Sequence, residues 1–191
     1  GVVVSDSCIA EIDLAVRSGR IEAQGARGSF DKGQFSEVVD ASGMLILPGL
    51  IDPHVHFDSP FMGSVTIHDF RTGSIAAAYG GVTTVISFTT QGKGESIIDN
   101  IERQNRDAER VSLIDWGFHG IVLDAKEETL GEIPKLVQAG FPTFKGFTTY
   151  KHSDRMLEDT DILAILKVTA QSKGMLMVHC ESDAILEHNL Q

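Results

Sequence analysis

Cysteine, basic residues and long apolar runs are scarce in this sequence, and each scarcity excludes something. Two cysteines, Cys8 and Cys180, are too few for a disulfide framework, so we expect a reducing, cytoplasmic setting. No apolar run approaches the ~20 residues of a membrane-spanning helix, and the N-terminus lacks the charged-then-apolar pattern of a signal peptide. These absences predict a soluble protein with no membrane partner.

Lysine and arginine total 16 against 27 aspartates and glutamates, which gives a net charge of −11. Nucleic acids and anionic membrane surfaces attract basic patches, so this balance argues against both as partners. Hydrophobic residues make up 42% of the 191 positions, enough for a real core. The length allows one domain or one and a half.

Residues 1–47 are predicted to be the N-terminal part of a small β domain. Val2–Val4 is β-branched, and residues 12–16 alternate between apolar and polar before a turn at residues 17–20. This pattern is typical of hairpins. The segment has too little apolar surface to form a sheet alone, so we expect it to need further strands from elsewhere.

Residues 48–191 follow a different pattern, in which strand-like and helix-like segments alternate. Such alternation predicts a parallel sheet with right-handed crossovers. The expected strands cover residues 45–51, 82–88, 115–122, 143–148 and 175–179, and the expected helices 69–79, 95–110, 129–139, 159–174 and 183–190. Pro134 suggests a late or bent start for the third helix, and Asp159 or Thr160 is the expected cap of the fourth. Five strands can complete a doubly wound sheet, or can begin a (β/α)8 barrel of ~250 residues.

The strongest chemical signal is His54-Val55-His56, directly after the apolar strand and its Pro-Gly turn. Side chains alternate along a strand, so the two imidazoles are expected on one face, placed to hold one metal ion. A lone histidine is more often a core or surface residue. The pair at this spacing favours metal binding.

Lys145 and His179 mark two later strand ends. A charged ammonium within a hydrophobic strand is disfavoured, so the pKa of Lys145 should fall, and a neutral amine can react with carbon dioxide to give a carbamate that bridges two metals. The alternative is a lysine that reaches solvent from the strand end. Polar residues at three strand ends favour the barrel, whose active sites lie at the carboxyl ends of its strands.

Several motifs together resemble the hydantoinase/dihydropyrimidinase family of the amidohydrolase superfamily. They are residues 51–61 around the two histidines, Gly92-Lys93-Gly94-Glu95-Ser96, Trp116-Gly117-Phe118-His119, Phe144-Lys145 and Thr149-Tyr150-Lys151. Dihydroorotases are related but usually carry an arginine two residues after the second histidine, where this chain has Asp58. Allantoinases are a weaker rival.

The resemblance implies a TIM-like (β/α)8 metal-dependent hydrolase barrel, of which residues 48–191 are about the first five strands. Part of a small β-sandwich domain would precede it. It further implies two divalent metal ions, zinc by analogy, with His54 and His56 on the first, carboxylated Lys145 bridging, and His179 on the second. Tyr150 would bind the substrate carbonyl oxygen and stabilise the oxyanion. A metal-bridged hydroxide would then open a cyclic amide ring, of the hydantoin or dihydropyrimidine type (EC 3.5.2). Residues 58–63 would line the pocket rim.

The family pattern also includes a further histidine and an aspartate on later strands, which this chain does not contain. We therefore expect the 191-residue chain alone to be inactive. The resemblance also implies that the full-length protein is a homo-oligomer, a tetramer. A non-catalytic, partner-binding dihydropyrimidinase-like protein is the alternative from another class, although such proteins have lost metal ligands that this chain keeps.

We expect His119 to be a packed, hydrogen-bonded side chain, Asp183 a helix cap, and Glu181 a possible hydrogen-bond partner of a ligand.

Overall fold

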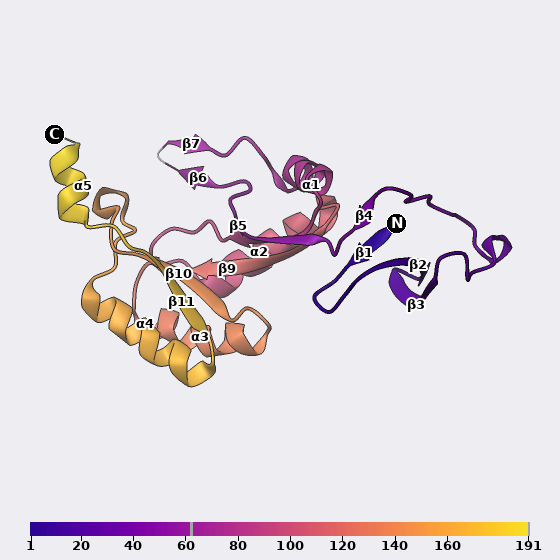
Figure 1. The fold of residues 1–191 in the computed structure, drawn as a ribbon. Coiled ribbons are helices and arrows are strands. Elements are labelled where there is room, and N and C mark those ends of the chain that lie inside the picture. The colour runs from indigo at the N-terminus through magenta and orange to yellow at the C-terminus, as the bar shows by residue number, and fades with distance from the viewer. Residues whose placement is uncertain (62, 191) are drawn as a thin grey trace. The chain divides into compact units, whose positions relative to one another are not determined.

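The structure is a computed structural model, and it describes residues 1–61 and 63–190. The chain divides into two compact units, Gly1–Gly49 and Leu50–Gln191 (Figure 1). Among the described residues, no helix is long and apolar enough to cross a membrane.

The first unit is a four-stranded sheet in the order β3-β2-β1-β4. Its elements are β1 Val2–Val4, β2 Ile9–Arg17, β3 Arg20–Ala26, the 3-10 helix η1 Lys32–Gln34, and β4 Leu45–Ile46. Ser18 and Gly19 connect β2 to β3 with positive φ angles of 51° and 74°, as a two-residue hairpin turn requires. Ala15 is the one buried hydrophobic residue among those described here, so this sheet has little core of its own.

The second unit is built on five parallel strands in the order β11-β10-β9-β8-β5. Its strands are β5 Leu50–Val55, β8 Val82–Phe88, β9 Asp115–Ile121, β10 Thr143–Phe147 and β11 Met175–His179, with a small hairpin of β6 Pro60–Phe61 and β7 Ser64–Val65. Its helices are α1 Phe70–Tyr79, α2 Ile97–Val111, α3 Glu127–Gln138, α4 Asp159–Ser172, α5 Asp183–Asn189 and the 3-10 helix η2 Lys151–Ser153.

Within this sheet the strands lie side by side in the order in which the chain forms them, β5, β8, β9, β10 and β11. A doubly wound sheet reverses its strand order at a switch point, and no such reversal occurs among the described strands. The sheet therefore has the winding of part of a (β/α)8 barrel, in agreement with the expected fold class.

The two faces of this sheet carry different hydrophobic clusters. Side chains alternate along β10, so Phe144 and Phe147 point to opposite faces. Phe144 belongs to the larger cluster, which joins the sheet to α2, α3 and α4 through Ile101, Ile133 and Ile165. Phe147 belongs to a smaller cluster with Phe88, Ile121 and Leu123, against which Tyr150 and Met177 pack. Lys145 shares the parity of Phe147, so it faces away from the helices.

Most predicted elements lie within two residues of those observed, but three details are wrong. The expected strand 45–51 is two strands, β4 and β5, because Pro48 lacks a backbone N–H and cannot continue a ladder. Helix α3 starts earlier than predicted, at Glu127, and contains Pro134 in its interior. The cap of α4 is Glu158, whose N–H donates to Asp161 Oδ2 at 3.3 Å, so neither Asp159 nor Thr160 caps it.

Candidate active site

His54 and His56 meet over one aromatic ring at the end of β5. Their ring centroids lie 5.4 Å apart, and the centroid of Phe88 on β8 lies 4.6 Å from that of His54 and 4.8 Å from that of His56. Burial lowers the pKa of His56, and the nearby positive charges of His54 and Lys145 lower it further. A neutral imidazole is the form that binds a metal, so this local field suits the predicted role.

His119 is buried beneath this pair and is hydrogen-bonded through both ring nitrogens, as expected for a packed histidine. Nε2 lies 2.8 Å from the carbonyl oxygen of Pro53, and Nδ1 lies 2.6 Å from Thr143 Oγ1. A carbonyl only accepts, so Nε2 carries the proton and the Thr143 hydroxyl donates to Nδ1. The bond to Pro53 falls where the β5–β8 register shifts, between Asp52 and Val55. His119 thus holds the irregular backbone just before His54.

Lys145 projects toward the same ring from β10. Its Nζ lies 5.5 Å from the centroid of Phe88 and 5.5 Å from that of Phe147. Burial lowers the pKa of this lysine, since an ammonium between two aromatic rings loses hydration. An amine of lowered pKa, next to two imidazoles, is a donor set that fits carboxylation and divalent metals.

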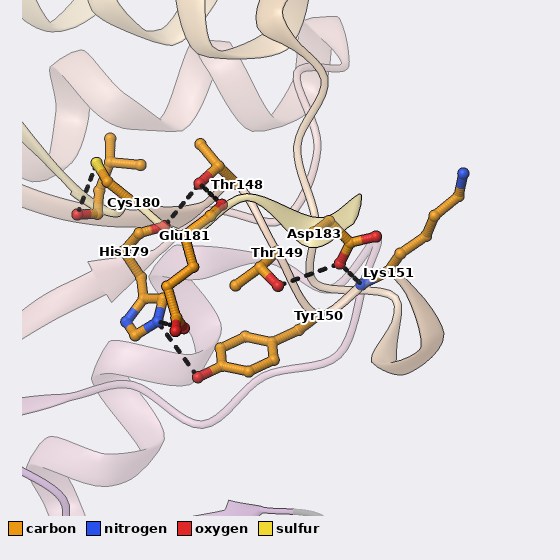
Figure 2. Close-up of polar contacts among 9 residues, drawn as sticks. Thr148, Thr149, Tyr150, Lys151, His179, Cys180, Glu181 and Asp183 are labelled. Atoms are coloured by element: carbon orange, nitrogen blue, oxygen red, sulfur yellow. Dashed lines mark hydrogen bonds and ion pairs between the residues drawn. The ribbon is translucent and has the colours of Figure 1, made fainter. Parts of the chain in front are cut away.

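His179 and Tyr150 form the other end of the site, beside Phe147. Their ring centroids lie 5.2 Å apart, and the Tyr150 hydroxyl lies 3.4 Å from His179 Nε2 (Figure 2). The same nitrogen is hydrogen-bonded to Glu181 Oε2, so Glu181 is a partner of His179 in this structure. The Phe147 centroid lies 6.2 Å from that of His179 and connects this end to Lys145.

The residues 148, 149 and 183 were not predicted to support the site, and they form a hydrogen-bonded link around Tyr150. Thr148 Oγ1 lies 3.0 Å from the His179 carbonyl oxygen and 2.8 Å from that of Glu181. Asp183 is not the cap of α5, because Ser182 occupies that position. Its carboxylate instead accepts from Thr149 Oγ1 and from the backbone N–H of Lys151 (Figure 2). In the sequence, the only indication of this link was the pair of adjacent threonines, Thr148 and Thr149, that follows the strand carrying Lys145.

A shallow cavity of about 700 Å³ lies near these strand ends. It is lined by the β6–β7 hairpin, by residues 90–92 after β8, and by Arg103 and Arg155. The hairpin carries most of the loop 58–63 expected at a pocket rim, although Met62 lies outside the described residues.

The structure therefore gathers His54, His56 and Lys145 around Phe88, and His179 with Tyr150 beside Phe147. Within the described part of the chain, no three His, Cys, Asp or Glu side chains group closely enough to hold a metal by themselves. The ligand set predicted from the sequence differs from such a group of His, Cys, Asp and Glu side chains. One of its members is a lysine, whose amine becomes a metal ligand only after carboxylation.

A family model described as "Amidohydrolase family" matches residues 45–191, and the chain belongs to the amidohydrolase family. The D-hydantoinase of Geobacillus stearothermophilus is 39% identical over 190 residues, covering 98% of this chain and 39% of that protein. The D-hydantoinase of Streptomyces coelicolor is 35% identical, covering 98% of this chain and 40% of that protein. A crystal structure of dihydropyrimidinase from Brevibacillus agri superposes with a TM-score of 0.91 at 34% identity, over 98% of this chain and 40% of that one.

These relatives place the chain in the hydantoinase/dihydropyrimidinase branch of the superfamily, as the motifs indicated. The chain spans about 40% of the length of the curated relatives it matches. The likeness to a D-hydantoinase crystal structure, with a TM-score of 0.90, also confirms that the five-stranded sheet is part of the amidohydrolase barrel.

Proposed function

We propose that the complete protein containing this chain is a metal-dependent hydrolase that opens a cyclic amide ring of the hydantoin or dihydropyrimidine type. The observation that carries the proposal is the Lys145 amine, held between Phe88 and Phe147 with its pKa lowered by burial, beside the His54–His56 pair. The relatives' names, D-hydantoinase and dihydropyrimidinase, support the same substrate class.

In this proposal His54 and His56 would hold one divalent ion and His179 would hold a second, and carboxylated Lys145 would supply an anionic oxygen ligand to both. Carboxylation joins the neutral amine to carbon dioxide and releases one proton, which turns a cation into an anionic ligand. Two divalent ions bound here, zinc by analogy, would supply a Lewis acid for the carbonyl and lower the pKa of a water molecule. Burial lowers the pKa of Lys145, which favours the reactive neutral amine.

Tyr150 is placed to act on the substrate itself. Its phenol, beside His179 Nε2, can donate a hydrogen bond to the amide oxygen as negative charge develops there. Water adds to the carbonyl carbon, and the ring C–N bond breaks. The carbonyl carbon becomes a carboxylate, and the released amide-type nitrogen takes up a proton from that water. The ring of Phe88 packs against both imidazoles, and the ring centroid of Phe147 lies 5.5 Å from the Lys145 amine.

The test uses the complete natural protein that carries this sequence. We expect about two divalent ions per chain by metal analysis, and hydrolysis of dihydrouracil and 5-substituted hydantoins. Lys145→Ala should lose bound metal and lower kcat/KM. Removing a residue that only supports a metal ligand typically costs about 10–100-fold, and the loss of Lys145 itself should be larger than that. Lys167→Ala, at an exposed position on α4, is the matched control and should keep both.

A protein without bound metal that turns over no cyclic amide would refute the proposal and leave the partner-binding alternative. Turnover confined to allantoin would keep the reaction class and change the substrate.

We further propose that the complete protein is a homotetramer in the cytoplasm. The family resemblance supports the tetramer, and the two unpaired cysteines support a reducing compartment. Light scattering of the purified protein tests the tetramer.

A further inference from the structure

Tyr150 is held in an unfavourable backbone conformation. Its φ of 68° and ψ of 40° lie in the left-handed region, where the Cβ of a bulky residue crowds the following carbonyl oxygen. Such a conformation persists only when surrounding contacts determine it. The Tyr150 carbonyl accepts from the N–H groups of Ser153 at 3.0 Å and Arg155 at 3.3 Å, but both donors belong to the same turn.

Asp183 contacts this turn from a different segment. Its Oδ1 accepts from Thr149 Oγ1 at 3.1 Å and from Lys151 N at 3.3 Å (Figure 2). The two donors belong to the residues on either side of Tyr150, so one carboxylate oxygen holds the side chain of Thr149 and the backbone of Lys151. Thr149 is 0% exposed, which leaves little access for water to replace this acceptor.

The same segment carries the candidate ligand His179, four positions before Asp183. Thr148 links the two loops a second time, through its hydroxyl and the carbonyl oxygens of His179 and Glu181. The loop after β10 and the loop after β11 are therefore joined on both sides of the Tyr150–His179 contact. Figure 2 shows the phenol of Tyr150 directed toward the His179 ring, with Asp183 at the opposite end of the turn.

We propose that Asp183 is a positioning residue that keeps Tyr150 in its left-handed turn, with the phenol beside His179 and ready for a substrate carbonyl. The inference rests on the proposed function, since the placement of Tyr150 matters for a reaction at that carbonyl. Asp183 acts on Tyr150 through the Thr149 hydroxyl and the Lys151 N–H.

The test is a double-mutant cycle in the complete, metal-loaded protein. Asp183→Ala should lower kcat about 10²-fold, the scale of an ångström-sized misplacement, while metal content is unchanged. Tyr150→Phe should cause a similar loss, and the double variant should be no worse than either single variant. Asp183→Asn keeps an acceptor oxygen and should retain most activity. Thr149→Val keeps the side-chain shape but loses the hydroxyl donor, so its kcat should lie between those of Asp183→Asn and Asp183→Ala.

Asp159→Ala is the matched control, because Asp159 is also the first residue of a helix, α4, and is exposed. It should leave kcat unchanged. Losses that multiply in the double variant would overturn the inference. A crystal structure of Asp183→Ala separates it from the proposed function: Tyr150 should leave the left-handed region even if no cyclic amide is hydrolysed. An unchanged Tyr150 φ and hydroxyl position would overturn the inference whatever the activity.

Discussion

His119 shows how a single side chain prepares a site that it does not enter. It spans from β9 to the Pro53 carbonyl on β5 and to Thr143 on β10, so three strands share one imidazole. Burial lowers its pKa, with smaller contributions from His54 and Lys145, while the bond to Pro53 acts in the opposite direction. The neutral ring with its proton on Nε2 satisfies both partners.

We predict that His119→Ala weakens metal binding in the complete protein by about 10–100-fold, the usual effect of removing an outer partner of a ligand. The Pro53 carbonyl would lose its partner, and the backbone that carries His54 would be free to shift. A metal titration against a chelator measures this change. His188→Ala, at an exposed histidine on α5, is the control, and equal affinities for the two variants would contradict the prediction.

At the scale of elements, helix α1 touches the site through a close contact with Phe57, the residue after His56. A Cβ added to Gly73 would lie 2.3 Å from Phe57 Cε1, and the Phe57 ring in turn packs 5.3 Å from that of Phe70. Phe57 is buried and has little freedom to move away. A glycine is therefore required at this point of the helix.

Gly73→Ala should destabilise the fold by about 1–3 kcal/mol, the usual range for overpacking a core. Gly131→Ala, also inside a helix but with no atom within 4 Å of the added Cβ, should instead stabilise it by about 0.5–1 kcal/mol. Urea unfolding of the two variants and the parent measures both effects. Changes of the same sign would contradict the prediction.

The N-terminus of α1 provides a pH-dependent contribution to stability. Asp69 accepts from Thr72 N and Thr72 Oγ1, both at 2.7 Å. These bonds, with the backbone bond the larger cause, hold the pKa of Asp69 below its ordinary value. A depressed folded-state pKa means that the stabilisation is present above the unfolded-state pKa and is lost as pH falls through the folded-state value.

Asp69→Ala should therefore lower the unfolding midpoint at pH 7, and the gap to the parent should close below the ordinary Asp pKa of about 3.9. Asp69→Asn, which can still cap the helix, should show a smaller gap at pH 7. Thermal unfolding at a series of pH values measures the difference. A gap that is constant with pH would mean that the carboxylate charge makes no contribution.

At the scale of the whole molecule, the sheet of the second unit has two edges, β5 and β11. Leu50, Ile51 and Met175 on these strands are 56%, 64% and 55% exposed, so each edge carries apolar side chains beside backbone groups that no described strand pairs. Edges of this kind pair readily with other chains.

We predict that the isolated 191-residue chain self-associates and opens no cyclic amide, even with added zinc. The family resemblance implies a further histidine and an aspartate that are not among its candidate ligands, and its sheet edges can pair with other copies. Light scattering gives the mass, and an assay of dihydrouracil and hydantoin hydrolysis gives the activity. A monodisperse monomer with measurable turnover would refute this prediction.

Much of this arrangement could be predicted from the chain itself. Glycines and apolar periods marked the strands and helices to within a few residues, and the polar residues at the strand ends indicated the site. Asp183 was misassigned because an aspartate before a helical pattern is most often a cap. Its actual partners lie 34 and 32 positions away, and local pattern carries no information on contacts at that separation.

What the sequence by itself determined is the alternation of elements, the residue types at the strand ends, and the motifs that place the chain in its family. These depend on local propensity and on spacing along one strand or helix. Only the tertiary structure decided the unbroken strand order, the bond from His119 to a carbonyl 66 positions away, and the carboxylate beside the Tyr150 turn. The reason is physical: hydrogen-bond partners are chosen by distance in space, and the packing of strands through the core sets that distance.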